Sequence, residues 1–297
     1  MINKNIKSLK ILIVAGGWSD EREISLMSGK NVFSCLKKNK FNVNFLNLKK
    51  GNMGKILEFK PDIIFNSLHG EFGEDGGINS FAQKNNIAIT HSGGVSSALC
   101  FNKRLLKKYL KKELNILSPK EIIYKNKLKF PVILKPNWGG SSKGVKFINS
   151  KNELSNNIYN PNILIEEIIY GKELTVTVIE NRKKITALGV TEIEYGNKHF
   201  DYIAKYTKNK SKHFLPARIT KSQYAFLMKI SKKIFRICQC KGIARLDFIM
   251  SKKNKKLYFL ELNTHPGLTK ISLAPEQANF HGFSYLYLLK QIINSSL

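Results

Sequence analysis

The first ninety residues alternate short apolar runs with polar segments that carry apolar residues at helical spacing. Apolar runs occur at residues 10–15, 41–48, 62–68 and 87–90, and each has the length of a β-strand. The segment after the first run has Ile24, Met27 and Val32 on one side of an expected helix. Strands that alternate with helices indicate a parallel sheet. We therefore predict an α/β domain over residues 1–93.

The remaining chain has a different pattern, in which strands follow one another and helices stand apart. We expect strands at residues 131–134, 163–169 and 174–178, and a hairpin formed by residues 245–250 and 257–262. A polar loop is expected between residues 178 and 201. Helices are expected at the basic segment around residues 103–108, at 221–239 and at 285–293, the last two with apolar stripes that indicate core positions. This pattern predicts α+β subdomains over residues 94–168 and 169–297.

Length and composition describe a globular protein of more than one domain. The chain has 297 residues, of which 42% are hydrophobic and 24% charged. Its apolar runs are far shorter than the roughly 18 residues of a membrane helix, so we expect no membrane insertion and a cytoplasmic protein. The four cysteines show neither zinc-site nor disulfide spacing, which favours buried free thiols; they are Cys35, Cys100, Cys238 and Cys240.

The charge balance is strongly basic and raises the question of a polyanionic partner. The formal net charge is +29, which would attract nucleic acid, anionic lipid or phosphorylated metabolites. However, the lysines are spread over the whole chain, and no zinc finger, helix-turn-helix or RNA-binding aromatic pair accompanies them. Specific nucleic-acid binding is kept as an alternative, and we do not expect it.

The predicted hairpin carries the strongest chemical pattern. Asp247, Glu261 and Asn263 lie at neighbouring ends of its two strands. Two carboxylates and an amide oxygen are hard ligands that suit Mg²⁺, which borrows further ligands from nucleotide phosphates. The alternative is that the carboxylates are only solvated strand ends. The pattern indicates an enzyme that handles phosphate groups.

Two glycine-containing turns follow strands of the predicted parallel sheet, at the edge where ligands bind in open α/β folds. After the first turn, Ser19 or Asp20 is expected to cap a helix that has Glu21 and Glu23 in its first turn. One of these carboxylates either stabilises the helix terminus or binds a cationic group in the cleft. In the second turn, His69 is placed to contact substrate, and the alternative is a hydrogen-bonded structural histidine. The dinucleotide pattern G-x-G-x-x-G is missing, so NAD binding is not expected.

A candidate phosphate site lies in the central segment. The strand at 131–134 leads into Lys135, and the glycine- and serine-rich stretch at 139–144, including Ser141 and Ser142, follows at once. Glycines let backbone amides approach phosphate, and the lysine supplies positive charge. A carboxylate that binds ribose is expected among Glu166, Glu167 and Glu173. The weakly periodic residues 201–206 are predicted to form either a loop over the site or a basic surface loop.

Six motifs, in order and over nearly the whole chain, resemble those of the D-alanine–D-alanine ligase family of the ATP-grasp superfamily. They are GGWSDEREIS, LHGEFGEDG, LKPNWGGSSKG, DYIAKY, ARLDF and ELNTHPGLTKIS. The resemblance implies an N-terminal Rossmann-like parallel-sheet domain followed by a two-subdomain ATP-grasp fold. It also implies ATP-dependent joining of two D-alanine molecules through an acyl phosphate, for peptidoglycan precursor synthesis, by a homodimer with two Mg²⁺ or Mn²⁺ per site.

The resemblance also assigns roles to individual residues. Glu21 would bind the ammonium of the first D-alanine beside His69, and Ser141 would link Glu21 with Tyr206 of the closing loop. Arg245 and the Gly267 amide would stabilise the oxyanion, and Ser272 would receive the second D-alanine's carboxylate. ATP would be held by Lys103, Lys135, Ser141, Ser142, Glu166, Glu173 and Lys205. The metal ligands would be Asp247, Glu261 and Asn263, with Glu261 bridging the two ions.

Three departures and two alternatives remain at this point. Lys143 stands where the family commonly has a small apolar residue, Ile203 where a charged residue is frequent, and His265 at a variable position. Tyr206 favours D-alanine over D-lactate as second substrate. The alternatives are an ATP-grasp ligase for another carboxylate and amine, and a basic nucleic-acid-binding protein that retains an inactive ligase fold.

Overall fold

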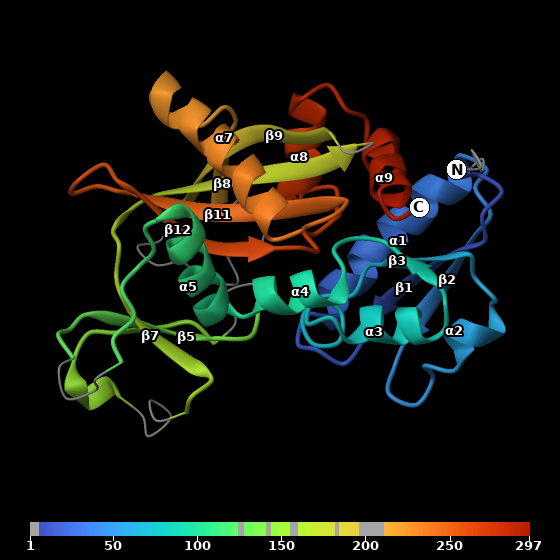
Figure 1. Cartoon of the computed structure of the whole chain (residues 1–297), viewed down its shortest axis with the longest axis horizontal. Coiled ribbons are helices and arrows are strands. Elements are labelled where there is room, and N and C mark those ends of the chain that lie inside the picture. The colour runs from blue at the N-terminus through green and yellow to red at the C-terminus, as the bar shows by residue number, and fades with distance from the viewer. Residues whose placement is uncertain (1–5, 124–127, 141–143, 155–159, 182–183, 196–210) are drawn as a thin grey trace.

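A computed structural model describes residues 6–123, 128–140, 144–154, 160–181, 184–195 and 211–297. In this part of the chain, the strands form three separate sheets with helices packed around them (Figure 1). Each sheet is built from a different stretch of the sequence, in the order expected from the patterns described above. The predicted mixture of α/β and α+β architecture is confirmed.

The N-terminal sheet is parallel throughout, as predicted, with strand order β2-β1-β3-β4. Its central strand β1 is fully buried because successive side chains contribute to two different cores. Ile11 and Ile13 pack with helix α1, whereas Leu12 and Val14 pack with α2 and α3. The strands are β1 Ile11–Gly16, β2 Val43–Leu48, β3 Ile63–Asn66 and β4 Ala88–Ile89, and the helices are α1 Arg22–Lys38, α2 Lys55–Glu58 and α3 Gly77–Lys84.

The central part contains two helices and a small antiparallel sheet of order β6-β5-β7. The sheet has its own small core, formed by Val132, Leu134, Ile148 and Ile165. The helices lead toward the next sheet, since Leu106 and Leu110 of α5 belong to the core of the five-stranded sheet. The elements are α4 Gly94–Phe101, α5 Lys103–Leu114, β5 Val132–Pro136, β6 Lys146–Ile148, the short 3-10 helix Lys151–Glu153 and β7 Ile163–Glu167.

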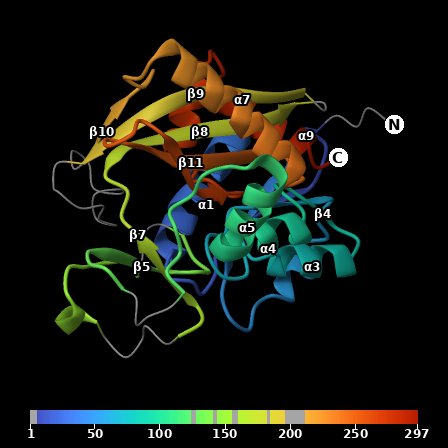
Figure 2. The ribbon, with the colours of Figure 1, turned by 60° about the vertical axis from the view of Figure 1, so that its left-hand side comes forward.

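The C-terminal sheet has five antiparallel strands in the order β10-β9-β8-β11-β12 (Figure 2). Alternation along β8 directs Leu174 and Val176 into the core shared with α5 and α7. Thr175 lies on the opposite face, where its carbonyl accepts the side-chain amide of Gln277 from α8 at 3.0 Å. The elements are β8 Gly171–Asn181, β9 Lys184–Tyr195, β10 Ser211–Phe214, α7 Lys221–Ile237, β11 Ile243–Ser251, β12 Leu257–Asn263, α8 Leu273–Phe280 and α9 Tyr285–Asn294.

The chain returns to its beginning at the C-terminal end. Leu288 and Ile292 of α9 are fully buried in one core with Ile11 of β1 and Val32 of α1. This core also includes Leu268, from the loop that follows β12. Packing of α9 and this loop against α1 therefore places the end of the predicted metal hairpin beside the N-terminal sheet.

Two sequence expectations about local structure are wrong. Neither Ser19 nor Asp20 caps α1: Glu21 is the N-cap residue and makes no capping bond. The Ser19 hydroxyl instead donates to the carbonyl of His69 at 2.6 Å. Strand β9 also occupies residues expected to form a polar loop. The Glu192 carboxylate of β9 is buried and lies 3.1 Å from the Lys172 ammonium and 2.7 Å from the Arg218 guanidinium. These two cations neutralise its charge, so a glutamate can occupy a buried strand position.

The helices and cysteines of the described residues bear on two further expectations from the sequence. Among the described residues, no helix combines the length and apolar character needed to cross a bilayer. Cys100, Cys238 and Cys240 are buried free thiols as predicted, whereas Cys35 is a free thiol that is only partly buried.

Candidate active site

Strands β11 and β12 place the predicted metal ligands beside one another. Asp247 is the direct cross-strand partner of Glu261, and Arg245 is the partner of Asn263. Directly opposite side chains on one face of an antiparallel pair lie about 4.5–5.5 Å apart at their Cβ atoms. The predicted hairpin is therefore confirmed, and its register gathers the two carboxylates.

The contacts of these residues test whether the group suits a divalent cation. Asp247 accepts hydrogen bonds from the Thr175 hydroxyl at 2.6 Å and from Arg245 at 2.8 Å. Glu261 lies 3.5 Å from the Lys103 ammonium. Both carboxylates thus face positive charge, as expected for anionic oxygens that must be neutralised. Asp247, Glu261 and the Asn263 amide offer hard oxygen ligands and fit Mg²⁺ or Mn²⁺.

A buried charge cluster lies behind the predicted phosphate site. The Glu166 carboxylate lies 2.6 Å from the Lys135 ammonium and 2.5 Å from that of Lys107. Burial alone would raise the pKa of Glu166, but the two lysines lower it below its usual range. Burial and the nearby charge of Lys135 lower the pKa of Lys107 to about 7. For Lys135, burial is outweighed by the Glu166 carboxylate, so its pKa is raised.

A cavity between the small sheet and the five-stranded sheet joins this cluster to the hairpin. Its polar lining comes from both sheets and from α5, and its apolar lining includes Ile133, Phe147 and Leu260. An apolar pocket with a few charged groups at one side suits a nucleotide, whose base is flat and whose phosphates are anionic. The predicted residues that line it are Lys103, Lys135, Glu166, Glu167, Glu173, Asp247 and Glu261.

The three carboxylates considered for ribose differ in their surroundings. Glu166 is committed to the two lysines. Glu167 is exposed and accepts the backbone N–H of Lys120 at 2.9 Å. Glu173 accepts the Tyr195 hydroxyl at 3.2 Å and lines the cavity from β8.

A second cavity adjoins the first and shares Asp247 and Glu173 with it. It collects residues from the beginning, middle and end of the chain. Glu21 comes from the N-terminus of α1 and is only 8% exposed. The residues predicted for substrate binding that line this cavity are Glu21, His69 and Ser272, and those predicted to stabilise the oxyanion are Arg245 and Gly267.

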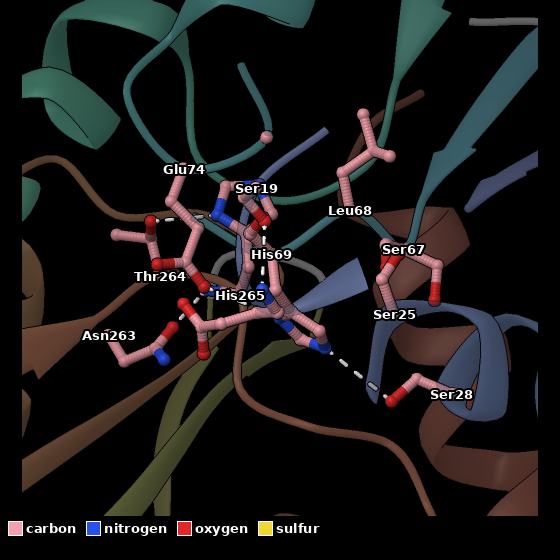
Figure 3. Close-up of polar contacts among 12 residues, drawn as sticks. Ser19, Ser25, Ser28, Ser67, Leu68, His69, Glu74, Asn263, Thr264 and His265 are labelled. Atoms are coloured by element: carbon pink, nitrogen blue, oxygen red, sulfur yellow. Dashed lines mark hydrogen bonds and ion pairs between the residues drawn. The ribbon is translucent and has the colours of Figure 1, made fainter. Parts of the chain in front are cut away.

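His69 is held from both sides of its ring in this cavity wall (Figure 3). Its Nδ1 lies 3.3 Å from a Glu74 carboxylate oxygen, and its Nε2 lies 3.5 Å from the Ser28 hydroxyl. Burial opposes protonation of the ring, but the bond to Glu74 and the charges of Glu74 and Glu21 raise the pKa of His69. Burial also raises the pKa of Glu74. The histidine is thus a fixed part of the pocket.

The loop from Gly267 to Ser272 is closely folded. The Ser272 hydroxyl lies 2.7 Å from the Thr269 hydroxyl, and it accepts the Thr269 backbone N–H at 3.2 Å. A Cβ added to Gly267 would lie 2.9 Å from the Ser272 oxygen, which is shorter than a normal contact. A side chain at position 267 would therefore require the Ser272 hydroxyl to move.

Comparison with known proteins identifies the family. The family model described as "D-ala D-ala ligase C-terminus" matches residues 107–294. A D-alanine–D-alanine ligase of Pelagibacter ubique is 40% identical over 305 residues, covering 97% of this chain and 98% of its relative. The chain belongs to the D-alanine–D-alanine ligase family. A member from Rickettsia felis is 37% identical and is aligned over 96% of this chain and 91% of its own length.

Solved structures of ligases in this family share the whole architecture. The D-alanine–D-alanine ligase from Bacillus anthracis, crystallised with ATP, has a TM-score of 0.80 and 29% identity, with 97% of both chains covered. The VanG D-Ala:D-Ser ligase from Enterococcus faecalis has a TM-score of 0.81 and 27% identity, covering 98% of this chain and all of its own. The ATP-grasp fold expected from the motifs is thereby confirmed.

Some residues of this ligase site were not predicted, and others are outside the described residues. Lys107, Glu74 and Thr175 contact predicted site residues, but the sequence analysis gave them no role. Glu74 lies within the motif LHGEFGEDG, and Lys107 lies four residues after Lys103 beside the buried stripe of α5; these are the signals that could have indicated them. The residues outside the described ranges are Ser141, Ser142, Lys143, Ile203, Lys205 and Tyr206.

Proposed function

We propose that the two adjoining cavities form one active site, in which ATP binds in the first and two D-alanine molecules bind in the second. The chain is an ATP-dependent ligase that produces D-alanyl-D-alanine. The observation that carries this proposal is the sharing of Asp247 and Glu173 by the two cavities, since a nucleotide in the first would have its phosphates next to an amino acid in the second. Peptidoglycan precursor synthesis uses this dipeptide.

The reaction must first make a carboxylate reactive. ATP phosphorylates the carboxylate of the first D-alanine, and the amine of the second then displaces phosphate from the acyl phosphate. We assign Lys103 and Lys135 to the phosphates of ATP, and Glu166 and Glu173 to the nucleotide side of the same cavity. Positioned cations stabilise the charge that develops during phosphoryl transfer.

The second cavity supplies groups for both amino acids. Glu21 is proposed to bind the ammonium of the first D-alanine, with His69 in the same wall. Arg245 and the Gly267 N–H are proposed to stabilise the oxyanion of the tetrahedral intermediate, and Ser272 to bind the second carboxylate. Removing one oxyanion donor of this kind generally costs about 2.7–4 kcal/mol of transition-state stabilisation.

The hairpin is proposed to hold the metal ions. Asp247, Glu261 and Asn263 would bind two Mg²⁺ or Mn²⁺, which would neutralise phosphate charge when bound. In the described structure, Arg245 and Lys103 contact the same carboxylates and keep them oriented toward the cavities.

Further parts of the proposal concern residues and properties beyond the described contacts. We assign Ser141 and Ser142 to ATP binding, Ser141 to a link between Glu21 and Tyr206, Lys205 to the phosphates, and Tyr206 to closure of the site. We also propose domains at residues 1–93, 94–168 and 169–297, a homodimer, and a cytoplasmic location. The support is the resemblance of the motifs in this chain to those of the family.

Purified protein would be tested with ATP and Mg²⁺, and with D-alanine, L-alanine, or D-alanine plus D-lactate or D-serine. Phosphate release and the identity of the product would be measured. We expect turnover with D-alanine alone and D-alanyl-D-alanine as product. If D-alanine joined to D-lactate or D-serine formed in preference to D-alanyl-D-alanine, the proposed second substrate would be wrong. No turnover with any combination would contradict the proposed function.

The metal assignment has its own variant. Glu261→Gln keeps the shape of the side chain but removes its charge, and we expect it to lower kcat by at least about 100-fold. Glu58→Gln, on the exposed side of α2, is the matched control and should retain wild-type turnover. Binding of Mn²⁺ in the presence of ADP, measured by electron paramagnetic resonance, would weaken only in Glu261→Gln. Wild-type turnover by that variant would contradict the assignment.

A further inference from the structure

A serine that belongs to none of the predicted site residues touches two loops of the substrate cavity. Ser28 lies in the second turn of α1 and is 1% exposed. Its hydroxyl oxygen accepts the backbone N–H of Leu268 at 3.3 Å and lies 3.5 Å from Nε2 of His69. Figure 3 shows Ser28 on one side of His69 and Glu74 on the other. One buried oxygen therefore connects the His69 loop with the loop after β12.

The Leu268 amide can only donate, so the Ser28 oxygen accepts from it. The hydroxyl also has a second lone pair and a proton, so it either accepts from or donates to His69 Nε2, according to the tautomer and charge of the ring. His69 Nδ1 lies 3.3 Å from the Glu74 carboxylate. In either arrangement, Leu268, Ser28, His69 and Glu74 form one buried network.

The order of carboxylate, histidine and serine also occurs in nucleophilic triads, but the surroundings of Ser28 do not suit attack on a substrate. Ser28 is buried on α1, where its hydroxyl contacts the loop after β12, and it is not among the residues that line the substrate cavity. One lone pair of its oxygen is already used by the Leu268 amide. The serine is thus suited to hold neighbouring groups in place.

The groups that Ser28 touches are tied to both predicted substrate positions. Leu268 follows Gly267, and its carbonyl accepts the Tyr285 hydroxyl at 2.8 Å, so this stretch of backbone is held from two sides. The His69 carbonyl accepts the hydroxyl of Ser19 at 2.6 Å, and the same hydroxyl accepts the Glu21 backbone N–H at 3.2 Å. A shift at Ser28 would therefore move Gly267 relative to Glu21 and His69.

We propose that Ser28 is a positioning residue that sets the Gly267 amide and the His69 ring relative to each other, so that the two amino acids are aligned for reaction. This inference rests on the proposed function. Ser28 makes no contact with substrate in this scheme. Its effect is exerted through Leu268 and His69, so its loss alters the alignment of the reacting groups and leaves the nucleotide cavity unchanged.

Ser28→Ala tests the proposal against a closely matched control. Ser25 lies on the same helix, three residues earlier, and is fully buried. It accepts the Gly16 N–H at 2.7 Å and donates to the Ser67 carbonyl at 2.8 Å, so Ser25→Ala also removes two buried hydrogen bonds. We expect Ser28→Ala to lower kcat by about 10-fold or more with an unchanged KM for ATP, as for loss of groups that orient a site. Ser25→Ala should retain the wild-type kcat.

A spectroscopic measurement separates positioning from general stability. The ¹⁵N resonances of the His69 ring report which nitrogen carries the proton and whether Nε2 accepts a hydrogen bond. We expect the Nε2 resonance to shift in Ser28→Ala and to stay in place in Ser25→Ala. If the alanine variant does not fold, Ser28→Cys keeps a side chain of similar size with a weaker hydrogen-bonding atom. It should shift the resonance and lower kcat in the same direction.

Equal loss of kcat in Ser25→Ala and Ser28→Ala would overturn the proposal, because it would show a merely structural effect. Wild-type kcat in Ser28→Ala, or an unmoved His69 resonance, would overturn it as well. Failure of the wild-type protein to form D-alanyl-D-alanine would instead reject the proposed function. The His69 resonance would still test the contact with Ser28 in that case, so the two failures are distinguishable.

Discussion

At the scale of single residues, the most unusual feature near the site is a stacked pair of buried histidines. The rings of His91 and His265 lie 4.7 Å apart and are inclined by 28°. In each, Nδ1 lies 2.9 Å from the hydroxyl of the preceding threonine. Burial, with a contribution from nearby His69, lowers the pKa of His91 to about 3, and burial lowers that of His265 far below its usual value. The pair is thus neutral when folded.

The neutral state of His91 makes stability depend on pH. Its pKa in the folded protein lies below the ordinary value of 6.5, so as the pH falls from 6.5 toward 3 the unfolded chain binds a proton that the folded chain does not. Stability is therefore lost on acidification. His91→Phe preserves a stacked ring. Between pH 8 and pH 5, we expect its free energy of unfolding to decrease by about 2 kcal/mol less than that of the wild type.

Urea unfolding at the two pH values would measure this difference. His281→Phe, at an exposed position, is the control for replacing a histidine by an aromatic ring. An equal loss of stability in the wild type and His91→Phe would show that the pKa of His91 is not lowered in the folded protein.

At the scale of elements, the position of α1 depends on a close approach to the sheet. A Cβ at Gly29 would lie 2.5 Å from the Cβ of Ala15 in β1 and 3.1 Å from the Phe45 ring. The small residues allow helix and sheet to come together. The same helix has Glu21 at its N-terminus and Ser28 next to Gly29, so its distance from the sheet also sets the position of site residues.

Gly29→Ala tests this packing. Alanine is the better helix former by roughly 1 kcal/mol, but the overlap with Ala15 must be relieved by moving the helix. We expect net destabilisation of about 1–3 kcal/mol and an increased KM for D-alanine. Lys30→Ala, exposed on the same helix, is the matched control. Chemical unfolding and steady-state kinetics would measure both effects, and a stabilised Gly29→Ala would show that the predicted overlap is relieved without cost.

Several elements could be predicted from their apolar pattern, whereas strand β9 could not. The parallel sheet, the hairpin and helices α5, α7 and α9 follow from residue pattern and agree with the structure. Strand β9 was missed because it contains Gly189, Glu192 and Glu194, residue types that are depleted in strands, although Glu192 to Tyr195 alternates charged and apolar side chains. It becomes a strand because β8 and β10 pair with it and because Lys172 and Arg218 neutralise Glu192.

At the scale of the whole molecule, the net positive charge is not concentrated at the proposed active site. The formal charge of +29 is spread over the chain, whereas the cavities contain clusters in which lysine or arginine faces carboxylate. Scattered surface lysines attract any polyanion through long-range electrostatics, which salt screens. A basic protein of this kind is expected to bind nucleic acid weakly and without regard to sequence.

Fluorescence anisotropy with labelled DNA duplexes of two unrelated sequences would test this expectation. We expect equal affinities at 50 mM salt and a decrease of about 1,000-fold or more by 200 mM, because binding by several lysines releases counterions from phosphate. Ligase turnover should be the same with and without duplex at 200 mM salt. Tight binding of one sequence that persists at high salt would support a nucleic-acid partner.

The sequence by itself determined the three successive blocks of strands and helices, the hairpin with its oxygen ligands, and the family through six ordered motifs. These features are readable because they depend on neighbours close in the chain, such as period-two alternation or a glycine turn after a strand. Only the tertiary structure decided which carboxylate is paired with Lys107 and Lys135, that Asp247 belongs to both cavities, and that Ser28 joins His69 to Leu268. Ser28 and Leu268 are 240 positions apart, and their contact arises because α9 and the loop after β12 pack on α1. Local pattern carries no information about such a contact, since burial and partner choice depend on how the sheets are packed together.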